Sequence, residues 1–220
     1  MNKKFAELAK KSKVIVIKVG SNILVNEKHS LRKKWLASLV EDVQKLQRKG
    51  SKIIIVSSGA IALGRKILSK KKLTNLHEKQ AAASIGQIQL SQEWQKAFAK
   101  CKIQSSQILI TAEDLNERRK YLNIRNTIYS LMDLNVVPII NENDTTSTEE
   151  IRFGDNDKLS AMIANVLSAE LLILLSDVNG LYTSNPKKSK QAKLITSVEE
   201  VNQQIEKYID KDLSEFGSGG

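Results

Sequence analysis

The stretch Val136-Val137-Pro138-Ile139-Ile140 is apolar at every position and runs directly into Asn141-Glu142-Asn143-Asp144-Thr145-Thr146. A short run of this kind is typical of a strand that is covered on both faces of a parallel sheet. The polar residues that follow would lie at the carboxyl end of the strand, where open α/β sheets bind their ligands. The stretch therefore predicts a buried strand with a polar site at its end.

The rest of the chain alternates between similar apolar runs and helical patterns. Further strands are expected at Val14–Val19, Lys52–Ser57, Gln107–Thr111 and Leu171–Ser176. Helical spacing recurs in 31–46 with Gly50 as terminator, in 80–99, in 117–135 and after Asp157, which is expected to cap its helix. The Thr-rich segment 145–153 is expected to form a short hairpin. This order predicts an α/β fold, a three-layer αβα sandwich with a mainly parallel open sheet.

Length and composition agree with one domain over residues 1–220. Apolar residues make up 41% of the chain and charged residues 27%, which are ordinary values for a globular protein. No apolar run reaches the roughly 18 residues of a membrane span, and the first residues lack the apolar core of a signal peptide. Cys101 is the single cysteine, which excludes an intrachain disulfide. We expect a cytoplasmic protein without a membrane partner.

The net charge of +11 raises the question of nucleic-acid binding. The lysines, however, occur as short scattered clusters, and aromatic residues make up only 5% of the chain. Proteins that bind single strands use regular aromatic platforms, which this pattern lacks. A lysine-rich solvated surface explains the charge better, and its positive field would help to attract an anionic nucleotide. We therefore expect no nucleic-acid partner.

A second polar cluster, Gly154-Asp155-Asn156-Asp157-Lys158, opens the amphipathic run that starts at Leu159. Asn and Asp favour turns and helix caps, so each cluster alone is explained equally well by local structure. Two clusters at strand or helix junctions favour a site for a small, very polar molecule.

Lys18 lies within the otherwise apolar run Val14–Val19, and Gly20 follows that run directly. It is either a strand-end lysine that reaches solvent or a cation placed for phosphoryl transfer; the glycine turns after the first two strands, at Gly20 and Gly59, favour the second interpretation. The segment from Gly59 to Lys66 has P-loop spacing but lacks the Lys-Ser/Thr pair that the motif requires.

The chain resembles the glutamate 5-kinases of the amino acid kinase superfamily from about Val14 to Gly220. The pairing of Asn141-Glu142-Asn143-Asp144 with Phe153-Gly154-Asp155-Asn156-Asp157 is specific to that family within the superfamily. The other matching segments are 17–21, 57–62, 79–83, 121–123, 138–140, 159–161, 174–177 and 180–182.

This resemblance implies ATP-dependent phosphorylation of the side-chain carboxylate of L-glutamate, the first step of proline biosynthesis. Lys18 would contact the transferring phosphoryl group and Asp157 would organise the catalytic lysines. Ser58, Asp144 and Asn156 would hold glutamate, with Asp144 suited to its ammonium and the amide of Asn156 to a carboxylate. The attacking carboxylate is already ionised at neutral pH and needs no general base.

The resemblance also implies a nucleotide side and several partners. ATP would be bound with Mg²⁺ bridging its phosphates, and no protein side chain is expected to ligate the metal. Proline is expected as a feedback inhibitor, a homo-oligomer as the assembly, and glutamyl phosphate reductase as a recipient of the product. The residues expected to contact the nucleotide are Lys18, Gly20, Ser176, Asp177, Ser218, Gly219 and Gly220.

The chain departs from the family pattern at two places. Ser176 stands where the family usually has Thr, and it keeps the hydroxyl. The final Gly217-Ser218-Gly219-Gly220 matches a nucleotide loop that usually continues into a second catalytic lysine, so we expect a C-terminally incomplete kinase domain without the RNA-binding-like module of many relatives. The alternatives are a catalytically impaired relative that binds glutamate or proline as a sensor, or a related kinase with another carboxylate substrate.

Overall fold

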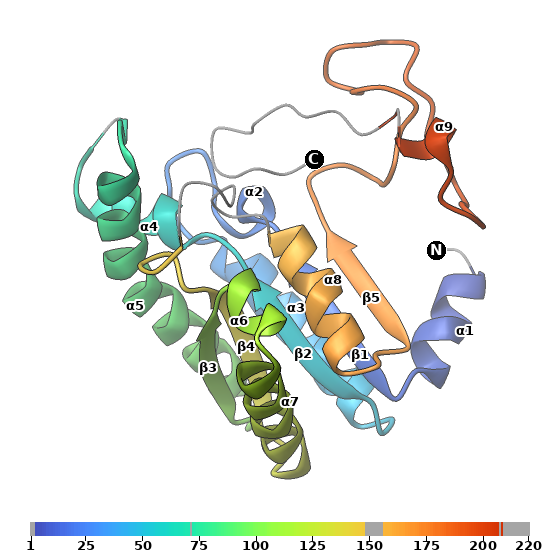
Figure 1. Ribbon diagram of the computed structural model, residues 1–220, viewed down its shortest axis with the longest axis horizontal. Helices are drawn as coiled ribbons and strands as arrows, with labels where there is room; N and C mark the ends of the chain where they lie inside the picture. The colour runs from blue at the N-terminus through green and yellow to red at the C-terminus, as the bar shows by residue number, and fades with distance from the viewer. Residues whose placement is uncertain (1–2, 71, 148–155, 207, 209–220) are drawn as a thin grey trace.

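The computed structural model describes residues 3–70, 72–147, 156–206 and 208 (Figure 1). Its five strands form one sheet in the order β3-β4-β2-β1-β5, and every pair of neighbours is parallel. The strands are β1 (Val14–Val19), β2 (Lys52–Ser57), β3 (Ser105–Ile110), β4 (Val137–Glu142) and β5 (Leu171–Leu175). The helices are α1 (Lys3–Lys11), α2 (Ser21–Leu24), α3 (Lys33–Gln47), α4 (Ala60–Ile67), α5 (Leu76–Lys100), α6 (Ala112–Asn116), α7 (Arg118–Asp133), α8 (Asn156–Val166) and α9 (Gln203–Glu206).

Helices cover both faces of the sheet. Since successive side chains of a strand point to opposite faces, neighbouring residues of one strand pack against different helices. Ile15 and Ile17 of β1 pack with buried residues of α3 and α5. Val16, between them in the sequence, packs with buried residues of α7 and α8 on the other face. In Figure 1, α7 and α8 lie in front of the sheet and α3 lies behind it. The predicted three-layer αβα architecture is therefore confirmed.

The direction in which successive strands are added across the sheet reverses once, after β3. From β1 through β2 to β3 the connecting helices α3 and α5 lie on one face, and from β3 through β4 to β5 the helices α7 and α8 lie on the other. A change of direction with a change of face is what crossovers of one hand require. Since all strands are parallel, their carboxyl ends meet along one edge of the sheet.

The short helix α4 lies against the first half of α5 with its backbone in direct contact. A Cβ atom on Gly86 would lie 1.8 Å from the Ala60 carbonyl oxygen, and one on Gly64 would lie 1.7 Å from that of Ala82. Only glycine permits this approach. Gly59 precedes α4 with φ of 110°, a left-handed conformation that glycine adopts without strain. The start of α4 is thus fixed where β2 ends.

Most of the expected elements are present with shifted bounds. The helix expected at 80–99 begins at Leu76, because the side chain of Asn75 caps it by accepting a hydrogen bond from the Glu78 amide. The strand β4 continues to Glu142, so Asn141 and Glu142 belong to the sheet rather than to a loop. Asp157 does not cap α8; it lies inside its first turn, after Asn156. Residues 148–153 of the expected hairpin lie outside the described residues.

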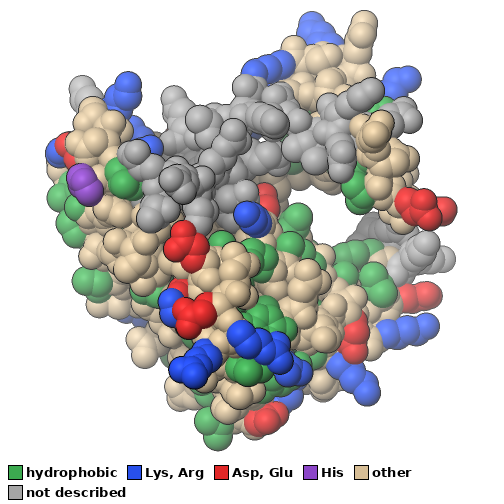
Figure 2. Space-filling model, viewed as in Figure 1, with side chains coloured by type: hydrophobic (Ala, Val, Ile, Leu, Met, Phe, Trp, Pro, Cys, Tyr) green, Lys and Arg blue, Asp and Glu red, His purple; other side chains and the backbone are tan. Residues whose placement is uncertain are grey.

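None of the helices in the described ranges combines the length and the apolar character needed to cross a membrane. The lysine and arginine side chains visible in Figure 2 form several separate groups interspersed with acidic ones. The absence of a nucleic-acid partner stays a prediction.

We expect Gly86→Ala to destabilise the protein, although alanine favours helix by about 1 kcal/mol over glycine. The added methyl group would collide with the Ala60 carbonyl, and such overpacking costs roughly 1–3 kcal/mol. Urea unfolding measures the change. The matched control is Ser84→Ala, at an exposed position of the same helix. A Gly86→Ala variant as stable as the control would contradict the backbone contact.

Candidate functional site

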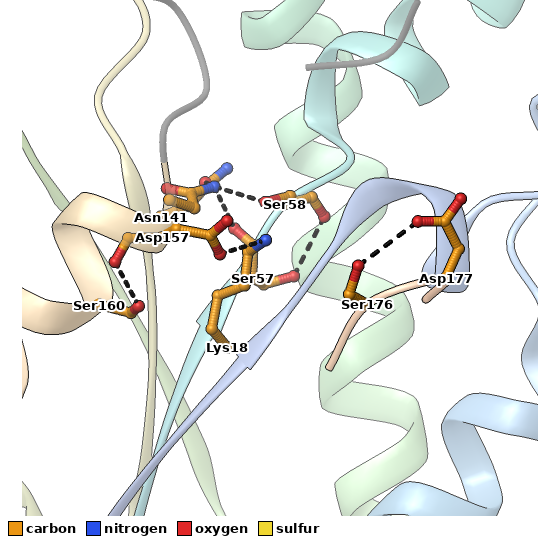
Figure 3. Close-up of polar contacts among 9 residues, drawn as sticks. Lys18, Ser57, Ser58, Asn141, Asp157, Ser160, Ser176 and Asp177 are labelled. Carbon is orange, nitrogen blue, oxygen red and sulfur yellow. Dashed lines mark hydrogen bonds and ion pairs between the residues drawn. The ribbon is translucent and has the colours of Figure 1, made fainter. Parts of the chain in front are cut away.

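Polar residues from several elements gather at the carboxyl edge of the sheet (Figure 3). They lie at the ends of β1, β2 and β4 or directly after β2, β4 and β5, and the first turn of α8 adds Asn156 and Asp157. Most of them are buried, although the strands beneath them are almost entirely apolar. Buried polar groups require partners, so their hydrogen bonds show which atoms are already used and which remain for a ligand.

Lys18 and Asp157 form an ion pair at the centre of this cluster. The Lys18 Nζ atom lies 2.6 Å from Asp157 Oδ1, and Lys18 is only 8% exposed. Lys18 shares the face of β1 that α8 covers, so the ion pair ties the strand to the first turn of the helix (Figure 3). The Asp157 side chain is 32% exposed, and a Cβ on Gly20 would lie 3.5 Å from Lys18 Nζ. A buried ammonium group is therefore held beside a glycine turn and next to solvent.

Asn156 uses its amide nitrogen inside the protein. Its Nδ2 atom lies 2.7 Å from Ser58 Oγ, 3.0 Å from Asn141 Oδ1 and 3.2 Å from the Ser57 carbonyl oxygen. The residue is 3% exposed, and its Oδ1 atom is buried without a hydrogen-bond partner. The expected pairing of this amide with a carboxylate is therefore not what the geometry offers. The atom left for a ligand is an acceptor, which suits an N–H donor.

Asp144 and Glu142 are two buried carboxyl groups at the end of β4. They are 8% and 6% exposed, and Ser147 donates a hydrogen bond from its Oγ to Glu142 Oε1 at 3.0 Å. Burial, and to a lesser extent the charge of Glu142, raise the pKa of Asp144 to about 7. Near neutral pH the Asp144 carboxyl group thus holds a proton part of the time, and a nearby cation would favour its ionised form.

The end of β5 carries a separate polar group. Lys187 Nζ lies 2.6 Å from Asp177 Oδ2, and Asn22 Nδ2 lies 3.4 Å from the same oxygen. The hydrogen bond from Lys187 is the main reason that the pKa of Asp177 is lowered. Ser176 lies beside Asp177, with 3.4 Å between Ser176 Oγ and Asp177 Oδ1 (Figure 3). These contacts link α2, which follows β1, to the segment after β5.

The structure thus brings most of the expected site residues to one edge of the sheet. Direct contacts join Lys18 with Asp157, Ser58 with Asn156, and Ser176 with Asp177. Ser218, Gly219 and Gly220 lie outside the described residues. The two histidines are not among these groups; His77 is exposed and His29 is half-buried.

Sequence reasoning missed several residues that support the site. Gln87 accepts a hydrogen bond from Asn141 Nδ2 at 2.8 Å, and Trp94 donates one from its indole Nε1 to Ser57 Oγ at 2.9 Å. Lys187 is the third, as the partner of Asp177. A polar residue such as Gln87 near the apolar face of a helix was the only available signal. It does not reveal which strand the side chain meets.

The sequence of this chain is similar to those of known proteins. The profile of the amino acid kinase family matches residues 13–220. Among curated proteins, the chain is 50% identical to "Glutamate 5-kinase" of Pelagibacter ubique (strain HTCC1062) over 212 residues, covering 96% of this chain and 58% of that protein. It is 49% identical to "Glutamate 5-kinase" of Brucella abortus (strain S19) over 207 residues, covering 94% of this chain and 55% of that protein. The chain therefore spans little more than half the length of these relatives.

Solved structures show the same fold at low sequence identity. An isopentenyl phosphate kinase superposes with a TM-score of 0.62 at 17% identity, over 85% of this chain and 81% of that one. The UMP kinase of Bacillus anthracis superposes with a TM-score of 0.59 at 18% identity, over 83% and 72% of the two chains. Together with the match over residues 13–220, these findings show that the chain belongs to the amino acid kinase family.

Proposed function

We propose that this protein transfers a phosphoryl group from ATP to the side-chain carboxylate of L-glutamate and forms L-glutamyl 5-phosphate, the first step of proline biosynthesis. The relatives that are named glutamate 5-kinase support this substrate. The observation that carries the proposal is structural. One edge of the sheet presents a buried lysine beside a glycine turn together with buried acceptors for an ammonium group.

In this proposal Asp144 and the Oδ1 atom of Asn156 receive the ammonium group of glutamate. Both are acceptors in a buried environment, where an unmatched charge or acceptor is unfavourable. An ammonium group supplies the counter-charge for the ionised Asp144 carboxylate and an N–H donor for the Oδ1 atom of Asn156. N-acetylglutamate carries a neutral amide instead of an ammonium and would leave Asp144 without a counter-charge. The site therefore favours a free amino acid.

Lys18 is the residue proposed to stabilise the transferring phosphoryl group. Attack by a carboxylate on ATP brings two anions together, so catalysis depends on positioning and charge neutralisation. Asp157 holds the Lys18 ammonium group at a fixed point without covering it completely. Gly20, Ser176 and Asp177 would border the nucleotide.

Magnesium would enter with the nucleotide as Mg-ATP. Within the described ranges, no group of three or more His, Cys, Asp or Glu residues is placed to hold a metal ion. Mg²⁺ is commonly bound through substrate phosphates with only one or two carboxylates. When bound, the ion would neutralise phosphate charge during the transfer.

The same acceptors also explain why proline is proposed as an inhibitor. Proline carries an ammonium group next to a carboxylate, as glutamate does, but has no side-chain carboxylate to phosphorylate. It would occupy Asp144 and Asn156 without reacting. A homo-oligomer and transfer of the unstable acyl phosphate to glutamyl phosphate reductase remain proposals from the family resemblance.

The activity is tested by incubating the protein with Mg-ATP, hydroxylamine and an amino acid, and measuring acyl-hydroxamate. We expect product with glutamate, none with N-acetylglutamate or aspartate, and suppression by proline. Product with N-acetylglutamate instead would contradict the substrate. Glutamate binding without any product would identify a sensor rather than an enzyme. The absence of both glutamate binding and product would contradict the proposal entirely.

We expect Lys18→Met to lower kcat by about 100-fold or more, the usual effect of removing one charge-stabilising group. Glutamate binding, measured by calorimetry, should weaken far less than kcat falls, because Asn156 keeps its own hydrogen bonds to Ser58 and Asn141. The matched control is Lys45→Met, which removes an exposed ion pair with Asp42 far from the site. Normal turnover in Lys18→Met would overturn its assignment.

We expect Asp144→Asn to stabilise the ligand-free protein at pH 8. The pKa of Asp144 is raised in the folded state, so its contribution to stability is full below pH 4 and is lost as the pH rises through 7. Removing the charge should therefore gain at most ~4 kcal/mol at pH 8 and less at pH 5. Urea unfolding at both pH values measures this.

Glutamate should stabilise the wild type at pH 8 but stabilise Asp144→Asn much less, because the variant cannot pair with an ammonium group. The exposed Asp133→Asn serves as the control. A variant that gains no stability with rising pH relative to wild type, or that glutamate stabilises as strongly, would refute the assigned role of Asp144.

A further inference from the structure

A chain of hydrogen bonds leads from the site to the edge strand β3, and all its donors point in one direction. Asn156 donates to Asn141, and Asn141 donates from Nδ2 to Gln87 Oε1 at 2.8 Å. Gln87 donates from Nε2 to Ser91 Oγ at 3.2 Å, and Ser91 donates to Gln107 Oε1. This series of hydrogen bonds therefore connects α8 through β4 and α5 to β3.

One backbone carbonyl determines the orientation of the amides nearest the site. The Ser57 carbonyl oxygen can only accept, so the Asn156 atom that lies 3.2 Å from it must be the nitrogen. Asn141 must then present its oxygen to Asn156, and its nitrogen turns to Gln87. If Asn141 rotated, two NH₂ groups would face each other in a buried environment. The oxygen of Gln87 opposes this rotation.

The consequence lies at the ligand end of the chain. With its nitrogen directed inward, Asn156 presents only the unpartnered Oδ1 atom, and it is 3% exposed. Asn141, which holds that nitrogen, is also 3% exposed, so no bulk water can replace its hydrogen bonds. An unmade hydrogen bond of this kind is costly, and the site therefore discriminates strongly for a donor.

We propose that Gln87 is a positioning residue that sets the preference of this site for ligands with an ammonium group. It acts through Asn141 and does not itself contact the ligand. This inference rests on the proposed function, because it assigns the ammonium group of glutamate to Asn156. It adds a residue on α5, two hydrogen bonds away from Asn156, whose side-chain oxygen holds Asn141 in the orientation that keeps the Asn156 nitrogen directed inward.

The test is calorimetric binding of L-glutamate and of glutarate, which has the same two carboxylates but no ammonium group. Gln87→Met keeps the length of the side chain and removes its acceptor. We expect its affinity for glutamate to fall about tenfold, as for the loss of one buried hydrogen bond, while its affinity for glutarate is unchanged. A purely structural defect would weaken both ligands together.

Two further variants complete the experiment. Gln87→Glu retains an oxygen that accepts from Asn141 and should restore the preference for glutamate over glutarate. Gln95→Met makes the same substitution at an exposed position of α5 and should behave as wild type. Urea unfolding of each variant confirms that it is folded before binding is compared.

The outcomes separate this inference from the proposed function. Wild-type binding of glutamate with an unchanged glutamate-to-glutarate ratio in Gln87→Met would overturn the role of Gln87 alone. Equal weakening of both ligands, or failure of Gln87→Glu to restore the ratio, would also overturn it. Wild-type protein that binds no glutamate would contradict the proposed function and this inference together.

Discussion

The ion pair between Lys18 and Asp157 is the interaction on which the rest of the site depends. A lysine inside an apolar strand is strongly unfavourable unless it is paired, and α8 supplies the partner from its first turn. The pair therefore fixes the start of α8 against β1. Asn156, the residue before Asp157, is placed at the end of β2 by the same constraint. The position of a cation and the position of an acceptor are thus coupled through two consecutive residues.

Rigid surroundings keep these groups in place. The glycine contact between α4 and α5 holds the turn after β2, where Ser58 meets Asn156. The same helix α5 carries Gln87, which orients Asn141. Against this rigidity, Asp144 is buried where no cation is hydrogen-bonded to it among the described residues, and its pKa is raised to about 7. The free protein holds an unfavourable group that an ammonium ligand would relieve, as expected at a binding site.

Much of the fold was predictable because apolar strands and helical spacing are local signals. The run from Val14 to Val19 and the glycine after it gave both a strand and one side of the site. The amide network was not predictable, since nothing in the sequence states that Gln87 faces Asn141 or that Asn156 directs its nitrogen inward. Those facts depend on strand order and helix register. The position of Asp157 relative to the start of α8 was not predictable, since adjacent Asn and Asp residues are equally suited to cap a helix and the sequence does not show where the helix begins.

The central claim is that the buried carboxyl group of Asp144, just after β4, binds the ammonium group of the ligand. It is tested most directly by counting protons during glutamate binding, using calorimetry at pH 7 in buffers of different ionisation enthalpy. Since Asp144 holds a proton about half of the time at its pKa, the account predicts release of roughly half a proton per glutamate bound. Release should vanish in Asp144→Asn. Glutamate binding with no proton release, or with proton uptake, would contradict the account.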